Sequence, residues 1–186
     1  MPPRPPNPAD ADLVAKAIAG DREAFGDLYE HYLPAIYRYV FYRVGDAGEA
    51  EDLTETVFVK AWEALERYRP TEAPFAAWLY RIAHNLVVDR HRAQKPVDPL
   101  DEHVVEVRPE ADPAAQAEAR EAASALAQAL KKLEPAQQEV LALRFVNGLS
   151  HAETATIMGR SAGAVRVLQH RALAALRQWL KKAESK

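Results

Sequence analysis

Apolar residues in this chain recur every three or four positions between its prolines, and this spacing is the strongest constraint on its fold. The clearest example is a set of six apolar residues at spacings i, i+3, i+4, i+7, i+8 and i+11: Phe75, Trp78, Leu79, Ile82, Ala83 and Leu86. These residues would form one apolar face of a helix over residues 75–92. Alanine, leucine, glutamate and arginine, all good helix formers, dominate the other stretches. The sequence therefore predicts an all-α protein.

A proline-containing acidic tract divides the chain at residues 95–112, where helical periodicity is lost. Such a tract is typical of a linker. We therefore expect two small helical domains, at residues 9–94 and 113–186, after a disordered tail at residues 1–8. The first domain is predicted to hold four helices, at about residues 9–19, 22–42, 47–68 and 75–92. The second is predicted to hold helices at about residues 113–133, 135–147, 151–158 and 162–182.

The net charge of −3 is unevenly distributed along the chain. Residues 1–95 sum to −3 (12 basic, 15 acidic), residues 96–125 to −6 (2 and 8) and residues 126–186 to +6 (10 and 4). A basic block of this size favours a polyanionic partner, and the acidic middle would repel the same partner.

The second domain contains the pattern of a helix-turn-helix. Ser150 and Glu153 form a capping box, Gly159 follows the short helix, and Ser161 can cap the long last helix. In this motif the second helix enters the DNA major groove, where arginine can read guanine and more distant basic residues meet phosphates. Helical phase turns a polar face outward that carries Arg166, Val167, His170, Arg171 and Arg177. A solvated basic face on an ordinary helical hairpin is the alternative.

A second candidate surface lies on the predicted helix at residues 75–92. Tyr80, Arg81, His84, Asn85, Val88, His91 and Arg92 all fall away from its apolar stripe. Aromatic, amide and basic groups together can stack an unpaired base and hold the adjacent phosphates. The alternative is that Trp78 and Tyr80 belong to the core and its rim, as we expect for Trp78.

Catalytic and metal chemistry find no support in the sequence. His84 and His91 are seven residues apart without a third ligand nearby, and the carboxylates Glu49, Glu51, Asp52 and Glu55 have no nucleophile or phosphate-binding loop beside them. Cysteine is absent, which excludes disulfides and thiolate metal sites. There is neither a signal-peptide pattern nor a run of about 18 apolar residues. We expect a cytoplasmic binding protein with no cofactor, no bound metal and no membrane insertion, and not an enzyme.

Four segments carry a resemblance to a known family. They are residues 50–62 with Ala50-Glu51-Asp52-Leu53 and Phe58, Lys60, Ala61 and Trp62; residues 75–92; residues 133–145, from Leu133-Glu134-Pro135 to Leu143-Arg144-Phe145; and residues 148–155 with Gly148-Leu149-Ser150, Glu153 and Ala155. Together they resemble the bacterial sigma factors of the extracytoplasmic-function (ECF) group, which have sigma region 2 and region 4 but lack region 3.

The resemblance implies a transcription initiation factor that binds core RNA polymerase, directs it to promoter DNA and promotes DNA melting. It implies polymerase contacts at or near Glu51, Asp52, Leu53, Glu55 and Phe58. It places Tyr68, Arg69, the loop at residues 70–74 and Asn85 at the minus-ten element, and we expect Arg81, His84, His91 and Arg92 on the same surface. Leu168 and Gln169 depart from the usual pattern of the recognition helix. Because helical phase puts Leu168 in the core, we assign minus-35 reading to Arg166, Val167, His170 and Arg171, with Arg177 behind them.

Three further questions stay open at this point. The acidic linker could thread through the polymerase as a nucleic-acid mimic, as in the family, or could be a plain spacer. Relatives are commonly held inactive by an anti-sigma factor, which is a candidate partner here. A helix-turn-helix regulator that binds duplex DNA without polymerase is the competing function, although such a protein does not need the motifs at residues 50–62 and 75–92.

Overall fold

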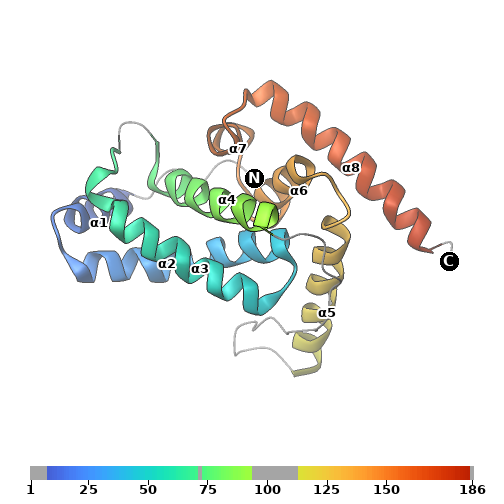
Figure 1. The fold of residues 1–186 in the computed structure, drawn as a ribbon, viewed down its shortest axis with the longest axis horizontal. Coiled ribbons are helices and arrows are strands. Elements are labelled where there is room, and N and C mark those ends of the chain that lie inside the picture. The colour runs from blue at the N-terminus through green and yellow to red at the C-terminus, as the bar shows by residue number, and fades with distance from the viewer. Residues whose placement is uncertain (1–7, 71–72, 94–112, 185–186) are drawn as a thin grey trace.

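A computed structural model describes residues 8–70, 73–93 and 113–184 of the chain (Figure 1). Every regular element in these ranges is a helix and none is a strand, so the all-α prediction is confirmed. The predicted linker at residues 95–112 lies outside the described residues. So does the predicted tail, apart from Pro8, at which the first helix begins.

The first half of the chain folds into four helices, as predicted. They are α1 (Pro8–Ile18), α2 (Arg22–Val44), α3 (Ala47–Ala64) and α4 (Phe75–Ala93). Asp21 and Asp46 cap α2 and α3 by accepting hydrogen bonds from backbone N–H groups of the first turn. Gly45 ends α2 at φ +69°, a left-handed conformation that glycine adopts without steric cost. The predicted helix at residues 47–68 ends earlier than expected, at Ala64, and continues as a 3₁₀ turn, η1 (Leu65–Arg67).

The second half holds α5 (Pro113–Leu130), α6 (Pro135–Leu141), a π-helical turn η2 (Ala142–Val146), α7 (His151–Met158) and α8 (Ala162–Glu184). The capping box of α7 is present in both directions, between Ser150 and Glu153. Gly159 ends α7 at φ +62°, and the hydroxyl of Ser161 accepts a hydrogen bond from Ala164 N at the start of α8. The predicted helix-turn-helix pattern is therefore confirmed.

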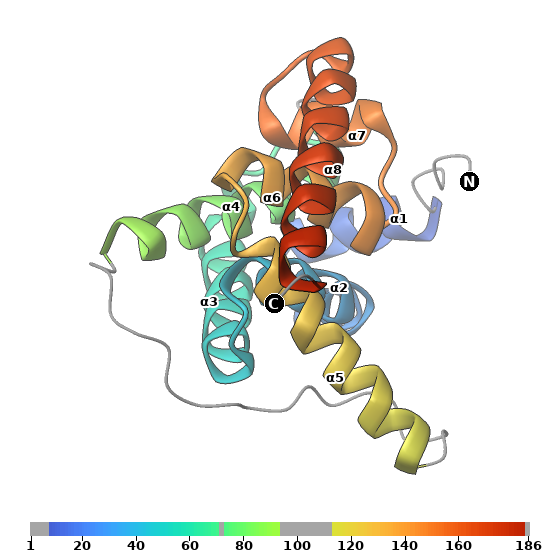
Figure 2. The same cartoon turned by 90° about the vertical axis from the view of Figure 1, so that its right-hand side faces the viewer.

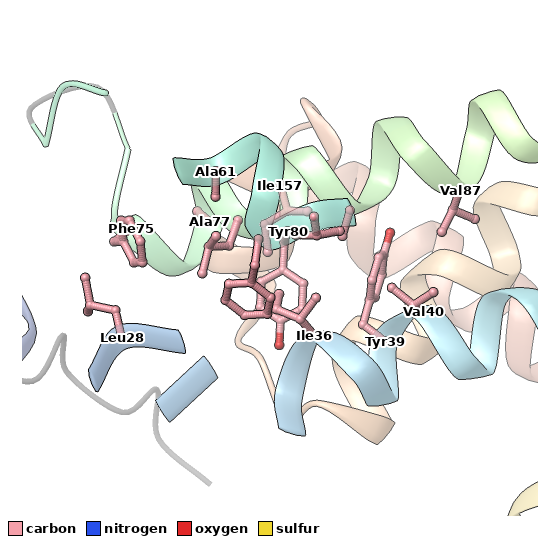
Figure 3. Packing of buried hydrophobic residues seen from close by; sticks show 14 of the residues in the cluster. Leu28, Ile36, Tyr39, Val40, Ala61, Phe75, Ala77, Tyr80, Val87 and Ile157 are labelled. Carbon is pink, nitrogen blue, oxygen red and sulfur yellow. The ribbon is translucent and has the colours of Figure 1, made fainter. Parts of the chain in front are cut away.

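The main core lies between α2, α3 and α4. Leu28, Ile36, Tyr39, Leu79 and Val87 are at most 1 % exposed there, and Figure 3 shows how the α2 and α4 side chains face one another. A second cluster joins α5, α6, α7 and α8 through Leu130, Val140, Leu141, Ala155, Val165 and Ala172.

The two halves of the chain pack against each other, which the sequence analysis did not predict. Helix α7 lies on α4, and α5 and η2 lie on α2 (Figures 1 and 2). Leu143 and Ile157 of the second half are buried in the same cluster as Tyr39 and Tyr80 of the first. Ile157 reaches this cluster beside Tyr80 (Figure 3). The main core therefore extends across both halves of the chain.

Candidate nucleic-acid and polymerase interfaces

Helix α8 exposes the side chains predicted to read DNA. Val165 and Ala172 are fully buried against the second core cluster, and Leu168 and Leu176 pack against it. The opposite face is exposed and carries all five predicted minus-35 residues: Arg166, Val167, His170, Arg171 and Arg177. Val167 is 53 % exposed although it is apolar, so it is available for contact with a partner such as a thymine methyl group. The predicted phase of this helix is correct.

A polar network that the sequence analysis missed holds α8 against the rest of the helix-turn-helix. Arg144 of η2 donates from Nε to Oε1 of Gln169 on α8, at 3.0 Å, and from Nη1 to the backbone carbonyl of Leu149 in the turn. His151, the first residue of α7, also hydrogen-bonds Gln169. Gln169 therefore joins η2, α7 and α8. The signal in the sequence was Gln169 itself, which departs from the recognition-helix pattern of the family that the sequence resembles.

The electrostatics of this network favour a neutral His151. Desolvation lowers the pKa of His151 below its ordinary value of 6.5, and the nearby guanidinium groups of Arg144 and Arg166 lower it further, against the opposing effect of the hydrogen bond with Gln169. A neutral imidazole at pH 7 leaves the positive charge of this region on the two arginines, close to the predicted DNA-reading face.

Gln169→Met should weaken recognition of the upstream promoter element roughly twofold to tenfold, the range expected for losing one or two part-buried hydrogen bonds. Methionine keeps the length of the side chain but removes the amide that Arg144 and His151 contact. The matched control is Gln178→Met, because Gln178 is exposed on the same helix. Binding of polymerase holoenzyme to cognate and mutated upstream elements measures the effect. Equal affinities for Gln169→Met and Gln178→Met would contradict it.

The predicted minus-ten surface is only partly exposed. Arg69, Arg81, Asn85 and Arg92 are exposed as expected. Tyr68 is not: it is 5 % exposed, its hydroxyl donates to Ala73 O at 2.7 Å, and its ring lies 4.8 Å from that of Trp78. Tyr68 is therefore buried in this structure, and its place at the minus-ten element stays a prediction. Its position at the end of a 3₁₀ turn, rather than on a helix face, explains the difference.

The two histidines predicted on α4 have protein partners. His84 is 29 % exposed, and its Nδ1 lies 2.7 Å from Oε1 of Glu139 on α6. His91 is exposed but hydrogen-bonds the backbone of Arg43, and burial followed by the Arg43 charge lowers the pKa of His91 below its ordinary value. Both imidazoles therefore contact other parts of the protein in this arrangement.

A shallow groove runs between α3 and α4 beside Asn85. Lys60, Arg67, Trp78, Asn85 and Asp89 are among its lining residues. Trp78 is half-buried and packs on Phe75 and Tyr68, in agreement with its predicted place in the core, yet one part of it borders this groove. An indole, an amide and two cations around one depression provide groups that can stack a base and bind phosphate.

Helix α3 presents an exposed acidic face. Glu51, Asp52 and Glu55 are exposed and Leu53 is half-buried, as polymerase contacts would require. Phe58 is 4 % exposed, with its ring 4.7 Å from that of Tyr29, so it belongs to the core, and its place at or near the polymerase contact stays a prediction. It lies about one helical turn from the buried Thr54 and Ala61, on the same side of α3.

Two exposed apolar residues extend the acidic face along α3. Val59 is 56 % and Trp62 39 % exposed. At 100° per residue they follow Asp52 and Glu55 on one side of the helix. The ring of Trp62 packs edge-on against Phe25, at 4.9 Å, which fixes its orientation. A stripe with carboxylates at one end and apolar groups at the other fits a protein partner better than free solvent does.

Comparisons with known proteins identify the family. The family descriptions Sigma-70 region 2 and Sigma-70, region 4 match residues 28–97 and 129–178. The ECF RNA polymerase sigma factor SigD of Mycobacterium tuberculosis is 40 % identical over 171 residues, which cover 89 % of this chain and 81 % of SigD. The chain is an ECF sigma factor.

Two further similarities agree with this assignment. The ECF RNA polymerase sigma factor BldN of Streptomyces coelicolor is 40 % identical over 175 residues, or 91 % of this chain, although the match spans only 65 % of BldN. The structure of CnrH in complex with the cytosolic domain of CnrY matches 94 % of this sigma factor and 98 % of CnrH, with 29 % identity and a TM-score of 0.74. Region 2 of this sigma factor thus corresponds to most of α2 to α4, and region 4 to α6 to α8.

The described part of this sigma factor contains neither a metal site nor a membrane span. Its described histidines and carboxylates form no group of three or more that could hold a metal ion. Among the helices seen in residues 8–70, 73–93 and 113–184, none has the length and apolar character needed to cross a membrane.

Proposed function

We propose that this sigma factor binds core RNA polymerase through α3, carries the enzyme to promoters and promotes DNA melting there. The exposed face of α8 reads the upstream element in duplex form. The α4 surface around Asn85 holds an unstacked base of the downstream element, together with Arg69 and Arg81. The protein acts by binding rather than by catalysis, without a cofactor, and works in the cytoplasm.

The observation that carries this proposal is that one chain exposes both a basic recognition helix and, on a separate element, an acidic stripe on α3. A basic recognition helix is what any protein that reads duplex DNA needs, with or without polymerase. A regulator that binds duplex DNA alone would have no use for the second, because carboxylates repel DNA phosphates. The α3 stripe therefore favours the polymerase-dependent function over the stand-alone regulator.

The double variant Asp52→Lys/Glu55→Lys should bind core polymerase roughly tenfold or more weakly, because like charges placed across an interface cost several kcal/mol. Its matched control is Glu118→Lys/Glu121→Lys on α5, where both carboxylates are exposed at the same spacing. Co-purification with core polymerase, followed by run-off transcription, measures the effect. If the unaltered protein does not co-purify with its polymerase yet binds promoter duplex alone, the stand-alone regulator is correct.

An inhibitory protein partner is a further part of the proposal. CnrH, which this sigma factor resembles over nearly its full length, was solved with the cytosolic domain of CnrY. We expect an anti-sigma factor to bind this protein in the same general way, and a co-purified inhibitor that blocks polymerase binding would support it.

A further inference from the structure

An aromatic cluster packs around the start of α4. It consists of Tyr32 of α2, Tyr68 directly after η1, and Phe75 and Trp78 of α4. The ring centre of Tyr68 lies 4.8 Å from that of Trp78 and 5.6 Å from that of Phe75. The ring centre of Tyr32 lies 5.6 Å from that of Phe75. These separations are typical of favourable aromatic contacts, so the cluster restricts the position of Trp78, which borders the groove beside Asn85.

The two tyrosine hydroxyls of the cluster make hydrogen bonds to different parts of the chain. The Tyr68 hydroxyl donates to the backbone carbonyl of Ala73 at 2.7 Å, and the Tyr32 hydroxyl donates to Oδ2 of Asp10 on α1 at 2.8 Å. Burial raises the pKa of both tyrosines above the ordinary value of 10.0, so both hydroxyls are donors at neutral pH. The Tyr68 bond therefore joins the end of η1 to the start of α4, while the Tyr32 bond joins α2 to α1.

Arg69, the residue after Tyr68, is held against η1 by its own side chain. Its Nη1 donates to the backbone carbonyls of Glu66 and Tyr68, at 2.8 and 3.1 Å. A guanidinium group carries five N–H donors in a planar fork. Because Arg69 is also exposed, this group can hold the two carbonyls and still bind a DNA phosphate. The position of the Arg69 guanidinium therefore depends on the position of the backbone at Tyr68.

The proposed minus-ten surface takes its groups from both sides of the segment between η1 and α4. Arg69 precedes this segment, and Arg81 and Asn85 follow it on α4. The Tyr68 hydroxyl joins the two sides directly, because Ala73 lies two residues before α4. A site whose groups are already in place loses less conformational entropy when its ligand binds. This saving matters for an unstacked base, because the contacts of the site must offset the cost of unstacking.

We propose that Tyr68 is a positioning residue for minus-ten recognition. Its hydroxyl and ring hold Arg69 in a fixed relation to the first turns of α4, so that an unstacked base and its phosphate meet groups that are already in place. Tyr68 acts through these groups and not by touching the DNA, in agreement with its exposed fraction of only 5 %. The proposal rests on the proposed function, which assigns the α4 surface around Asn85 to the minus-ten element.

The test is Tyr68→Phe in holoenzyme assembled from the full-length protein and core polymerase. Phenylalanine keeps the ring in the aromatic cluster and removes only the hydroxyl, so the variant should fold normally. We expect its affinity for a single-stranded oligonucleotide with the non-template minus-ten sequence of a cognate promoter to fall roughly threefold to tenfold, as for one lost buried hydrogen bond. Its affinity for a duplex that carries only the upstream element should not change. Fluorescence anisotropy with labelled oligonucleotide and labelled duplex measures both affinities.

Tyr32→Phe is the matched control, because it removes a hydrogen-bonded hydroxyl from the same aromatic cluster. Both variants should lower the melting temperature by a similar amount, whereas only Tyr68→Phe should lower the affinity for the oligonucleotide. A second readout combines Tyr68→Phe with Arg69→Ala. In that background Tyr68→Phe should cost less affinity than it costs alone, because residues that act through one another have non-additive effects.

Three results would each overturn the positioning role while leaving the proposed function intact. They are an unchanged oligonucleotide affinity in Tyr68→Phe, an equal loss of that affinity in Tyr32→Phe, and fully additive losses when Tyr68→Phe is combined with Arg69→Ala. The first two would mean that the Tyr68 hydroxyl only stabilises the fold. If the unaltered holoenzyme binds the upstream duplex but not the minus-ten oligonucleotide, the function proposed for α4 is wrong, and the positioning role is wrong with it.

Discussion

The purified protein without polymerase should bind promoter duplex about 1,000-fold more weakly than the same protein in the holoenzyme, a difference typical of non-specific against specific binding. Two features of the molecule cause this. The chain has a net charge of −3 although residues 126–186 are basic. The basic face of α8 therefore attracts DNA phosphates, while the acidic remainder of the chain repels them. Region 4 also packs on region 2 in this structure, and we expect this packing to keep one free molecule from holding both promoter elements at once, so that the two binding energies do not add.

Fluorescence anisotropy with a labelled promoter duplex at physiological salt provides the measurement, first with the protein alone and then with core polymerase present. A scrambled duplex is the control, because the free protein should distinguish it poorly from the promoter. Nanomolar affinity of the free protein for its promoter would contradict the prediction and favour the function of a stand-alone regulator over the polymerase-dependent one. In that case α8 and α4 would have to engage DNA without help.

Local features of the sequence predicted the helices and the orientation of the recognition helix well. The Asp21 and Asp46 caps, the capping box at Ser150 and the glycine at 159 each act within a few residues of their partners. Such signals can be read from a sequence because both members of each pair are close along the chain. Helical phase likewise predicted correctly that Leu168 packs against the core and that Arg171 is exposed to solvent.

The contact between the two halves could not be predicted in this way. Tyr39 and Glu139 are separated by 100 positions, and the sequence around each residue gives no indication that the two are in contact. Glu139 looks in the sequence like an ordinary surface carboxylate of a short helix, and only the packing of α6 on α2 explains its burial. Phe58 and Tyr68 are a different case, because their surface roles were implied by family resemblance and not by helical phase, and both residues are buried.

Arg171→Ala should reduce holoenzyme affinity roughly 5- to 150-fold on the cognate upstream element, the range for losing one bidentate arginine contact to guanine, and much less on an element altered at that base pair. Arg171 is exposed on the DNA-facing side of α8, in the half of the helix nearer its N-terminus. The loss must depend on sequence if the guanidinium reads a base edge. It would not depend on sequence if the group only met a phosphate.

Arg177→Ala is the matched comparison, because Arg177 is an exposed arginine on the same helix, nearly two turns further from the N-terminus. We expect it to weaken binding by a similar factor on every sequence and to reduce the salt dependence of the affinity by about one phosphate contact. Titrations of both variants against cognate and altered elements at several salt concentrations separate the two roles. If Arg171→Ala instead lost affinity equally on all sequences, Arg171 would be a phosphate contact like Arg177. Base reading would then rest on Arg166, Val167 and His170, which lie nearer to the start of the helix.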